Sequence, residues 1–131
     1  MTAIQCTELP VFRGIDVHDS FVLGWSHTND ALIFDLEASV WPQHPAHEKP
    51  KRNEFTCYKN ATLTFQAPTE VHGLRQLDAV TPTTDPDGSK DYDSIERFEL
   101  DDDGTIHIAG DFGDVTIKGA TIQFTINHNA I

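Results

Sequence analysis

Apolar and polar residues alternate through the C-terminal third of the chain. Successive side chains of a strand point to opposite faces, so this period of two is typical of antiparallel strands buried on one face. Its apolar members are Ile106, Ile108, Phe112, Val115, Ile117, Ile122, Phe124 and Ile126. The pattern slips between Ile117 and Ile122. It therefore predicts either two strands joined near Gly119 or one long strand bulged at that glycine.

A hairpin is predicted between residues 20 and 40. Phe21, Leu23 and Trp25 would share one face of a first strand, Ser20–His27. Residues 28–30 (Thr-Asn-Asp) are turn formers. The second strand would point one face inward with Leu32, Phe34, Leu36, Ala38 and Val40. We expect the two segments to pair as antiparallel strands.

The middle of the chain is more varied. Three prolines exclude a central strand over residues 41–53, a segment that also holds the basic cluster of Lys49, Lys51 and Arg52. Alternation resumes over 55–65, where Lys59 interrupts the apolar face and indicates a bulge or an edge position. Residues 71–80 fit a short helical turn or an irregular strand, and 81–91 a loop. A hairpin of 95–100 and 105–109 would turn at Asp101–Gly104.

These elements predict an all-β fold. We expect an antiparallel β-sandwich or a strongly curved meander sheet of seven or eight strands, with at most one short helix. A chain of 131 residues is the usual size of a single domain, here residues 1–131. Cys6 and Cys57 are too few for a disulfide scaffold, although a bridge between them stays open.

Charge narrows the choice of partner. Twenty-one acidic residues against nine basic ones give a formal net charge of −12, which would repel nucleic acid and anionic membranes. Such a surface suits either solubility alone or attraction of a basic protein. The first eight residues lack the basic and apolar regions of a signal peptide, and no apolar run spans a membrane. We expect a cytoplasmic protein.

The candidates for metal binding are weak. His44, His47 and Glu48, with Cys57 nearby, offer donors that zinc accepts, but Pro45 opposes a helix presenting both histidines on one face. The sequences of residues 85–88 and 101–104 resemble calcium loops, yet neither has a carboxylate at the required last position. Turn formation explains both better, although a weak cation site stays open at Asp85, Asp87, Asp91 and Asp93. We expect no cofactor.

Catalytic motifs are missing from the sequence. It contains neither a G-x-S-x-G elbow nor a glycine-rich phosphate loop. Cys57 is better explained as a small buried residue than as a nucleophile. His107 lies between two isoleucines and should point to the opposite face of its strand. His18 and Asp19 are adjacent and face opposite ways, which disfavours a proton-transfer pair.

The run Val17-His18-Asp19-Ser20-Phe21 fits the entrance of a strand, where Asp19 and Ser20 would bond neighbouring backbone N–H groups. Together with Gly110-Asp111-Phe112-Gly113-Asp114-Val115-Thr116-Ile117, this run resembles small bacterial β-rich proteins of uncharacterised or immunity-protein type. The two segments cover about a tenth of the chain. The resemblance implies a binding role and transfers no catalytic residues.

We therefore expect a non-enzymatic protein that binds another protein with a basic surface, in the manner of an immunity protein or antitoxin. Interface hot spots favour Trp and Tyr, which makes Trp25, Trp41 and Tyr58 the binding candidates. Homodimerisation stays open. The alternative is a ligand- or metal-binding β-barrel, or an enzyme, that uses the loop of His44 and His47.

Overall fold

The predicted all-β class is confirmed. The computed structural model describes residues 4–50, 52 and 56–127. Their strands are β1 Ile4–Gln5, β2 Ile15–His27, β3 Ala31–Val40, β4 Cys57–Gln66, β5 Glu70–Leu74, β6 Thr83–Thr84, β7 Lys90–Asp91, β8 Arg97–Leu100, β9 Ile106–Gly110, β10 Gly113–Lys118 and β11 Thr121–Ile126. The helical content of these residues is three single 3₁₀ turns, η1 Cys6–Glu8, η2 Pro10–Phe12 and η3 Leu77–Ala79.

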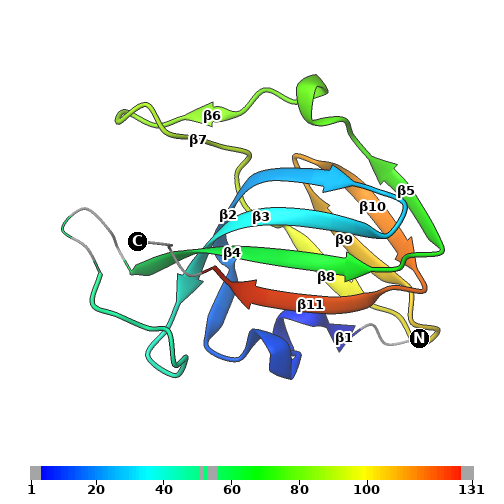
Figure 1. Ribbon diagram of the computed structural model, residues 1–131, viewed down its shortest axis with the longest axis horizontal. Coiled ribbons are helices and arrows are strands. Elements are labelled where there is room, and N and C mark those ends of the chain that lie inside the picture. The colour runs from blue at the N-terminus through cyan, green and yellow to red at the C-terminus, as the bar shows by residue number, and fades with distance from the viewer. Residues whose placement is uncertain (1–3, 51, 53–55, 128–131) are drawn as a thin grey trace.

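Two antiparallel sheets form the layers of the fold (Figure 1). One has the strand order β1-β8-β9-β10-β5 and the other β11-β4-β3-β2, while β6 and β7 form a small separate hairpin. In the described part of the chain the sheets keep free edges. The closed barrel of the alternative prediction is therefore wrong.

The core lies between the two sheets and is rich in phenylalanine. Phe34 and Phe65 from one sheet meet Phe98 and Phe112 from the other, and all four are fully buried. The ring centroids of Phe34 and Phe112 lie 4.8 Å apart in an edge-to-face arrangement, which aromatic rings favour. The predicted inward positions of β3 are confirmed, as are the buried isoleucines of β9 and β10.

The C-terminal alternation forms two strands, the first of the two predicted arrangements. The chain turns at Gly119, whose φ is +77° and which therefore suits glycine. Strand β10 pairs with β9 and β5, whereas β11 crosses to the other sheet and pairs with β4. On β11, the side chains of Ile122, Phe124 and Ile126 are only half-buried.

The first hairpin is confirmed, but the predicted face of its first strand is wrong. Strand β2 begins at Ile15 rather than Ser20, and its register with β3 shifts between Val22 and Gly24. This bulge buries Val22 and turns Leu23 outward, where it is 36% exposed. A strict alternation across residues 21–25 cannot anticipate an extra residue in the strand.

A second register shift of β2 surrounds the His18-Asp19-Ser20 run, which lies inside the strand instead of at its entrance. Ser20 Oγ accepts a hydrogen bond from the backbone N–H of Ser39 at 2.9 Å and donates one to Asp16 O at 2.7 Å. The backbone role predicted for Ser20 is thus confirmed. The backbone N–H of Asp19 donates a hydrogen bond to the carboxylate of Asp16 at 3.2 Å.

The remaining predictions have mixed outcomes. Pairing of β4 with β3 continues through Lys59 without a bulge, so the bulge explanation is wrong. The pairing of β4 with β11 is described as far as Ala61, and the edge explanation stays a prediction. Residues 71–80 contain both predicted forms, strand β5 and the turn η3. Cys6 and Cys57 are free and buried. The predictions for Lys51, Asn53 and Phe55 lie outside the described residues.

Candidate binding groove

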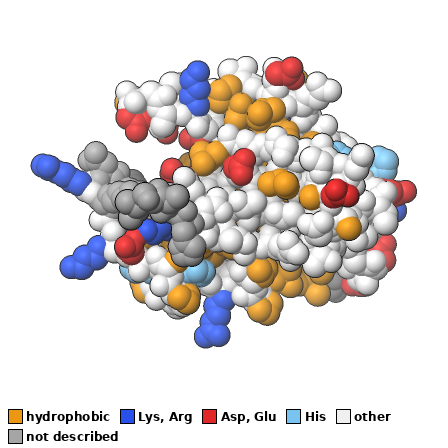
Figure 2. All heavy atoms as spheres, viewed as in Figure 1, with side chains coloured by type: hydrophobic (Ala, Val, Ile, Leu, Met, Phe, Trp, Pro, Cys, Tyr) orange, Lys and Arg blue, Asp and Glu red, His pale blue; other side chains and the backbone are white. Residues whose placement is uncertain are grey.

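A groove opens along the side of the sandwich where β2 and β5 form the outer strands. Its volume is about 790 Å³. Three of its lining residues come from the end of β2, and seven come from β5, the segment that follows it and η3; Tyr92 completes the wall. In Figure 2, hydrophobic side chains are exposed along the upper margin, where this segment lies. The most exposed of the groove's large apolar residues is Leu77, at 40%.

Trp25 joins the groove to the core. Its indole Nε1–H donates a hydrogen bond to the backbone carbonyl of Arg75 at 2.8 Å, which links the two sheets. The ring lies edge-to-face against Tyr92, at 4.9 Å between centroids, and Phe112, at 6.0 Å. Only 7% of Trp25 is exposed. Of the three predicted binding residues, Trp25 alone lies in this groove, as part of its wall rather than as a projecting anchor.

A glycine sets the position of the Arg75 carbonyl. Gly73 has a φ of +91°, and a Cβ there would lie 2.0 Å from the backbone oxygen of Asp114. The end of β5 can therefore approach β10 this closely only with glycine. The chain continues from this contact to Arg75, whose N–H bonds Phe112 O at 2.8 Å.

The edge of β2 is covered over only part of its length. Val22 N–H bonds Asp93 O at 2.8 Å, and Tyr92 N–H bonds Val22 O at 2.7 Å. Beyond Val22, the sheet in the described part of the chain adds no strand outside β2. Backbone groups along an open strand edge are able to pair with an extended segment of another chain.

Two carboxylates, Asp93 and Asp111, interact with each other near Arg75, which lines the groove, although neither carboxylate lines the groove itself. Asp93 follows Tyr92 directly, and Asp111 precedes Phe112. Burial raises the pKa of Asp111 above its ordinary value, and repulsion from Asp93 and Glu96 adds to this effect. The nearby guanidinium of Arg75 opposes the shift. The local field is therefore negative, and it would favour the approach of a positively charged group.

Trp41 and Tyr58 lie away from the groove. Trp41 is 46% exposed and borders a separate hollow of about 410 Å³, together with Arg13 and His18. The ring of Tyr58 is 5.9 Å from that of Phe21, and its hydroxyl lies 3.4 Å from Asp19. The structure does not bring the three predicted residues into one site.

His44 and His47 belong to a turn that follows Trp41. The His47 N–H bonds His44 O at 3.0 Å, and His44 Nδ1 accepts the N–H of Ala46, also at 3.0 Å. Among the residues that the structure describes, no three His, Cys, Asp or Glu side chains come together as a metal site. The carboxylates of Asp85 and Asp87 bond Ser89 instead, which agrees with the turn interpretation.

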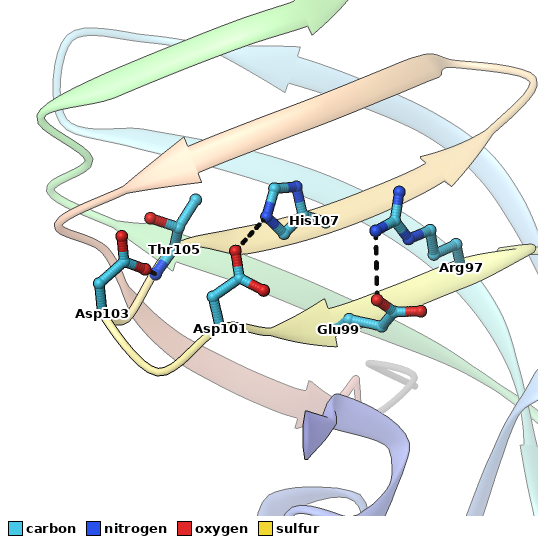
Figure 3. A network of polar contacts seen from close by, with 6 residues as sticks. All are labelled: Arg97, Glu99, Asp101, Asp103, Thr105 and His107. Atoms are coloured by element: carbon cyan, nitrogen blue, oxygen red, sulfur yellow. Dashed lines mark hydrogen bonds and ion pairs between the residues drawn. The ribbon is translucent and has the colours of Figure 1, made fainter. Parts of the chain in front are cut away.

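A second polar cluster covers the outer face of β8 and β9 (Figure 3). His107 points outward, as predicted, and its Nε2 lies 2.7 Å from Asp101 Oδ2. Arg97 donates a hydrogen bond to Glu99 at 3.2 Å, which lowers the pKa of Glu99 and raises that of Arg97. These groups pair with one another along one face of the sheet. We therefore interpret the cluster as stabilising the hairpin rather than as a binding site.

Sequence reasoning missed the residues that complete the groove, namely Tyr92, Arg75 and Leu77. Arg75 and Leu77 lie in the segment interpreted as a short helical turn or an irregular strand, and Tyr92 lies between the predicted loop and the next predicted strand. Leu77, an apolar residue between Gln76 and Asp78, was the one available signal.

Comparisons with protein-family models, curated proteins and solved structures find no match to this chain. No helix in the described ranges has the length and apolar character to cross a bilayer.

Proposed function

We propose that this protein is a non-catalytic binding module whose groove between β2 and β5 receives an extended basic segment of a partner protein. The observation that carries the proposal is a groove with apolar residues in its wall, together with the interacting carboxylates Asp93 and Asp111 near its Arg75. An aliphatic side chain of the partner would contact Trp25 and Leu77. A Lys or Arg beside it would face Asp93 and Asp111, and its charge would relieve their mutual repulsion.

The distribution of charge supports a basic partner. Residues 78–114 hold 12 of the 21 acidic residues and two of the nine basic ones. Opposite fields of this kind accelerate encounter and orient the partner. Neutralisation of a basic toxin in the cytoplasm, as by an immunity protein or antitoxin, is the biological role we propose for such binding.

The test uses two synthetic hexapeptides, one alternating Arg and Leu and one alternating Glu and Leu, titrated into the intact protein by calorimetry. We expect the basic peptide to bind. Its affinity should fall as the salt concentration is raised, because screening weakens surface charge pairs. The acidic peptide should not bind.

Variants locate the binding. Leu77→Lys should weaken the basic peptide about tenfold by placing a like charge in the apolar wall, and Asp93→Asn with Asp111→Asn should weaken it by a similar factor. Asp102→Asn is the control because it removes one acid from the exposed turn after β8. Equal affinity in all variants, or equal binding of both peptides, would refute the groove as the site.

A further inference from the structure

Strand β11 leaves one side of the four-stranded sheet open. It pairs with β4 over six consecutive residues, Thr121–Ile126, with no register shift. On its other side, the described part of the chain adds no strand, as Figure 1 shows. A straight, fully extended edge of this kind presents unpaired N–H and C=O groups that are ready to accept another strand.

The usual protections of an edge strand are missing from β11. Edge strands are commonly shielded by charged side chains, proline or a bulge. Residues 119–131 contain no Asp, Glu, Lys, Arg or Pro, whereas 30 of the 131 residues in the chain are charged. The other outer strands differ: β2 carries Asp16 and Asp19 and is partly covered by residues 92–94, and β5 carries Glu70. Strand β1 has only two residues.

Charge identifies the partner that suits this edge. Two copies of a chain with a net charge of −12 repel each other wherever their acidic surfaces meet. They approach at least cost where neither copy carries a charge. A basic protein would gain nothing from an uncharged strand and would be drawn to the carboxylates elsewhere.

We propose that two copies of this chain associate by antiparallel pairing of their β11 strands about a twofold axis at Gln123. The two four-stranded sheets would become one eight-stranded sheet. Thr121 of one copy would face Thr125 of the other, a favourable cross-strand pair, and Gln123 would face itself. The exposed residues of both copies then lie on the same side of the sheet.

The surface beside β11 has room and apolar contacts for the second copy. A hollow of about 430 Å³ lies against the end of the strand, lined by Val11, His44, Pro45, Ala46, Phe124, Thr125 and Ile126. Val11 is 39% exposed. Hydrophobic side chains gather along the lower margin of Figure 2, over β11 and the η2 segment. In the proposed register, Thr121 of the second copy pairs opposite Thr125, so Ile122 of the second copy faces Phe124 and would enter this hollow.

Sedimentation equilibrium of the full chain tests the proposal. We expect a reversible monomer–dimer equilibrium with no larger species, because a twofold contact closes on itself. Gln123→Lys should weaken the dimer about tenfold or more by placing two like charges directly opposite each other. Thr84→Lys makes the same change of charge on exposed β6 and should leave the equilibrium unchanged. A monomer at every concentration, an open series of oligomers, or a dimer insensitive to Gln123→Lys would each overturn the proposal.

Disulfide trapping tests the register separately. Directly opposite residues in antiparallel strands have Cα atoms about 4.5–5.5 Å apart, within the range of a disulfide. Gln123→Cys should therefore form a covalent dimer under mild oxidation. Thr121→Cys should not, because the two copies of residue 121 lie four positions out of register with each other. The two native cysteines are buried and give little background. Cross-linking of Thr121→Cys but not Gln123→Cys would refute the register.

Discussion

The two open sides of the sandwich differ in almost every property that matters for binding. On the side of β2 and β5, the groove is lined by Trp25 and Tyr92, and the interacting carboxylates Asp93 and Asp111 lie near its Arg75. On the side of β11 and β1, the turns η1 and η2 fill the gap, and the edge strand has no charge. Phe12 of η2 is buried there against Phe98 and Phe124.

The comparison teaches how one sandwich can present two separate surfaces. On the β11 side, η1 and η2 pack between the sheets and the open strand edge is the main feature, so recognition there depends on backbone pairing and low charge. On the β2–β5 side, the larger groove offers side-chain contacts and a local electric field. The two proposals therefore predict partners of opposite character, a second copy on one side and a basic segment on the other.

The largest expected difference between the two sides is in stability. Phe112 is fully buried beneath the groove, whereas Phe124 is half-buried beside the open edge. Phe112→Ala should cost about 3–5 kcal/mol of unfolding free energy, the usual range for a buried phenylalanine. Phe124→Ala should cost about 1–2 kcal/mol because less apolar surface is lost. Urea denaturation measures both, and equal costs would mean that the β11 side is packed as tightly as the groove side.

On the side of β11 and β1, ionisation of Cys6 should lower the stability of the protein at alkaline pH. This thiol is fully buried in η1, and burial raises its pKa from 9.0 to about 11, with a contribution from the nearby negative charge of Glu99. The folded state then holds its proton more tightly than the unfolded state. Stability is fully present below pH 9 and falls by about 2–3 kcal/mol between pH 9 and 11. Cys6→Ala should remove this part of the decline, and an identical pH profile in the variant would contradict the assignment.

The groove side depends on the link between Trp25 and Arg75. Trp25→Phe keeps an aromatic ring but removes the Nε1–H donor, which should cost about 1–2 kcal/mol from the lost hydrogen bond and the smaller ring. Hydrogen exchange of the backbone between β5 and η3 should accelerate at the same time. Unchanged exchange there would mean that the Gly73 contact alone holds the segment in place.

The smallest effect is expected at Asp111. The raised pKa of Asp111 means that its charged form is disfavoured by folding, so its contribution to stability declines as pH rises through the folded value. Asp111→Asn should therefore stabilise the protein at neutral pH, by at most about 0.5 kcal/mol, with the gain disappearing in strong acid. Thermal melts at pH 7 and pH 3 measure the difference. A loss of stability at pH 7 would indicate that attraction to Arg75 dominates.

The layers of the fold could be predicted because burial repeats along them. Ile106, Ile108, Val115 and Ile117 alternate with outward residues and are buried as expected. Leu23 differs because the register shift between Val22 and Gly24 turns it outward, while Val22 and Trp25 on either side are buried. Neither the twist of a strand nor the position of a bulge can be predicted from the alternation of apolar and polar residues.

The groove could not be predicted because its parts are distant in the sequence. Trp25 meets Arg75 and Tyr92 only after two sheets have been stacked, and the Tyr92 segment carries no periodic pattern. Asp93 adopts a φ of +58°, a conformation that sequence reasoning assigns to glycine or asparagine first. Trp25 was selected as a binding residue for its side-chain type alone, which carries no information on where in the fold the ring would lie.

The contrast between the two tryptophans makes this protein its own optical sensor. The indole of Trp25 is shielded and fixed by one hydrogen bond, so its emission should be shifted to shorter wavelength than that of the far more exposed Trp41. Occupation of the space beside Trp25 would change the first signal and leave the second as an internal reference. Recordings from Trp41→Phe would isolate the emission of Trp25 without any added dye.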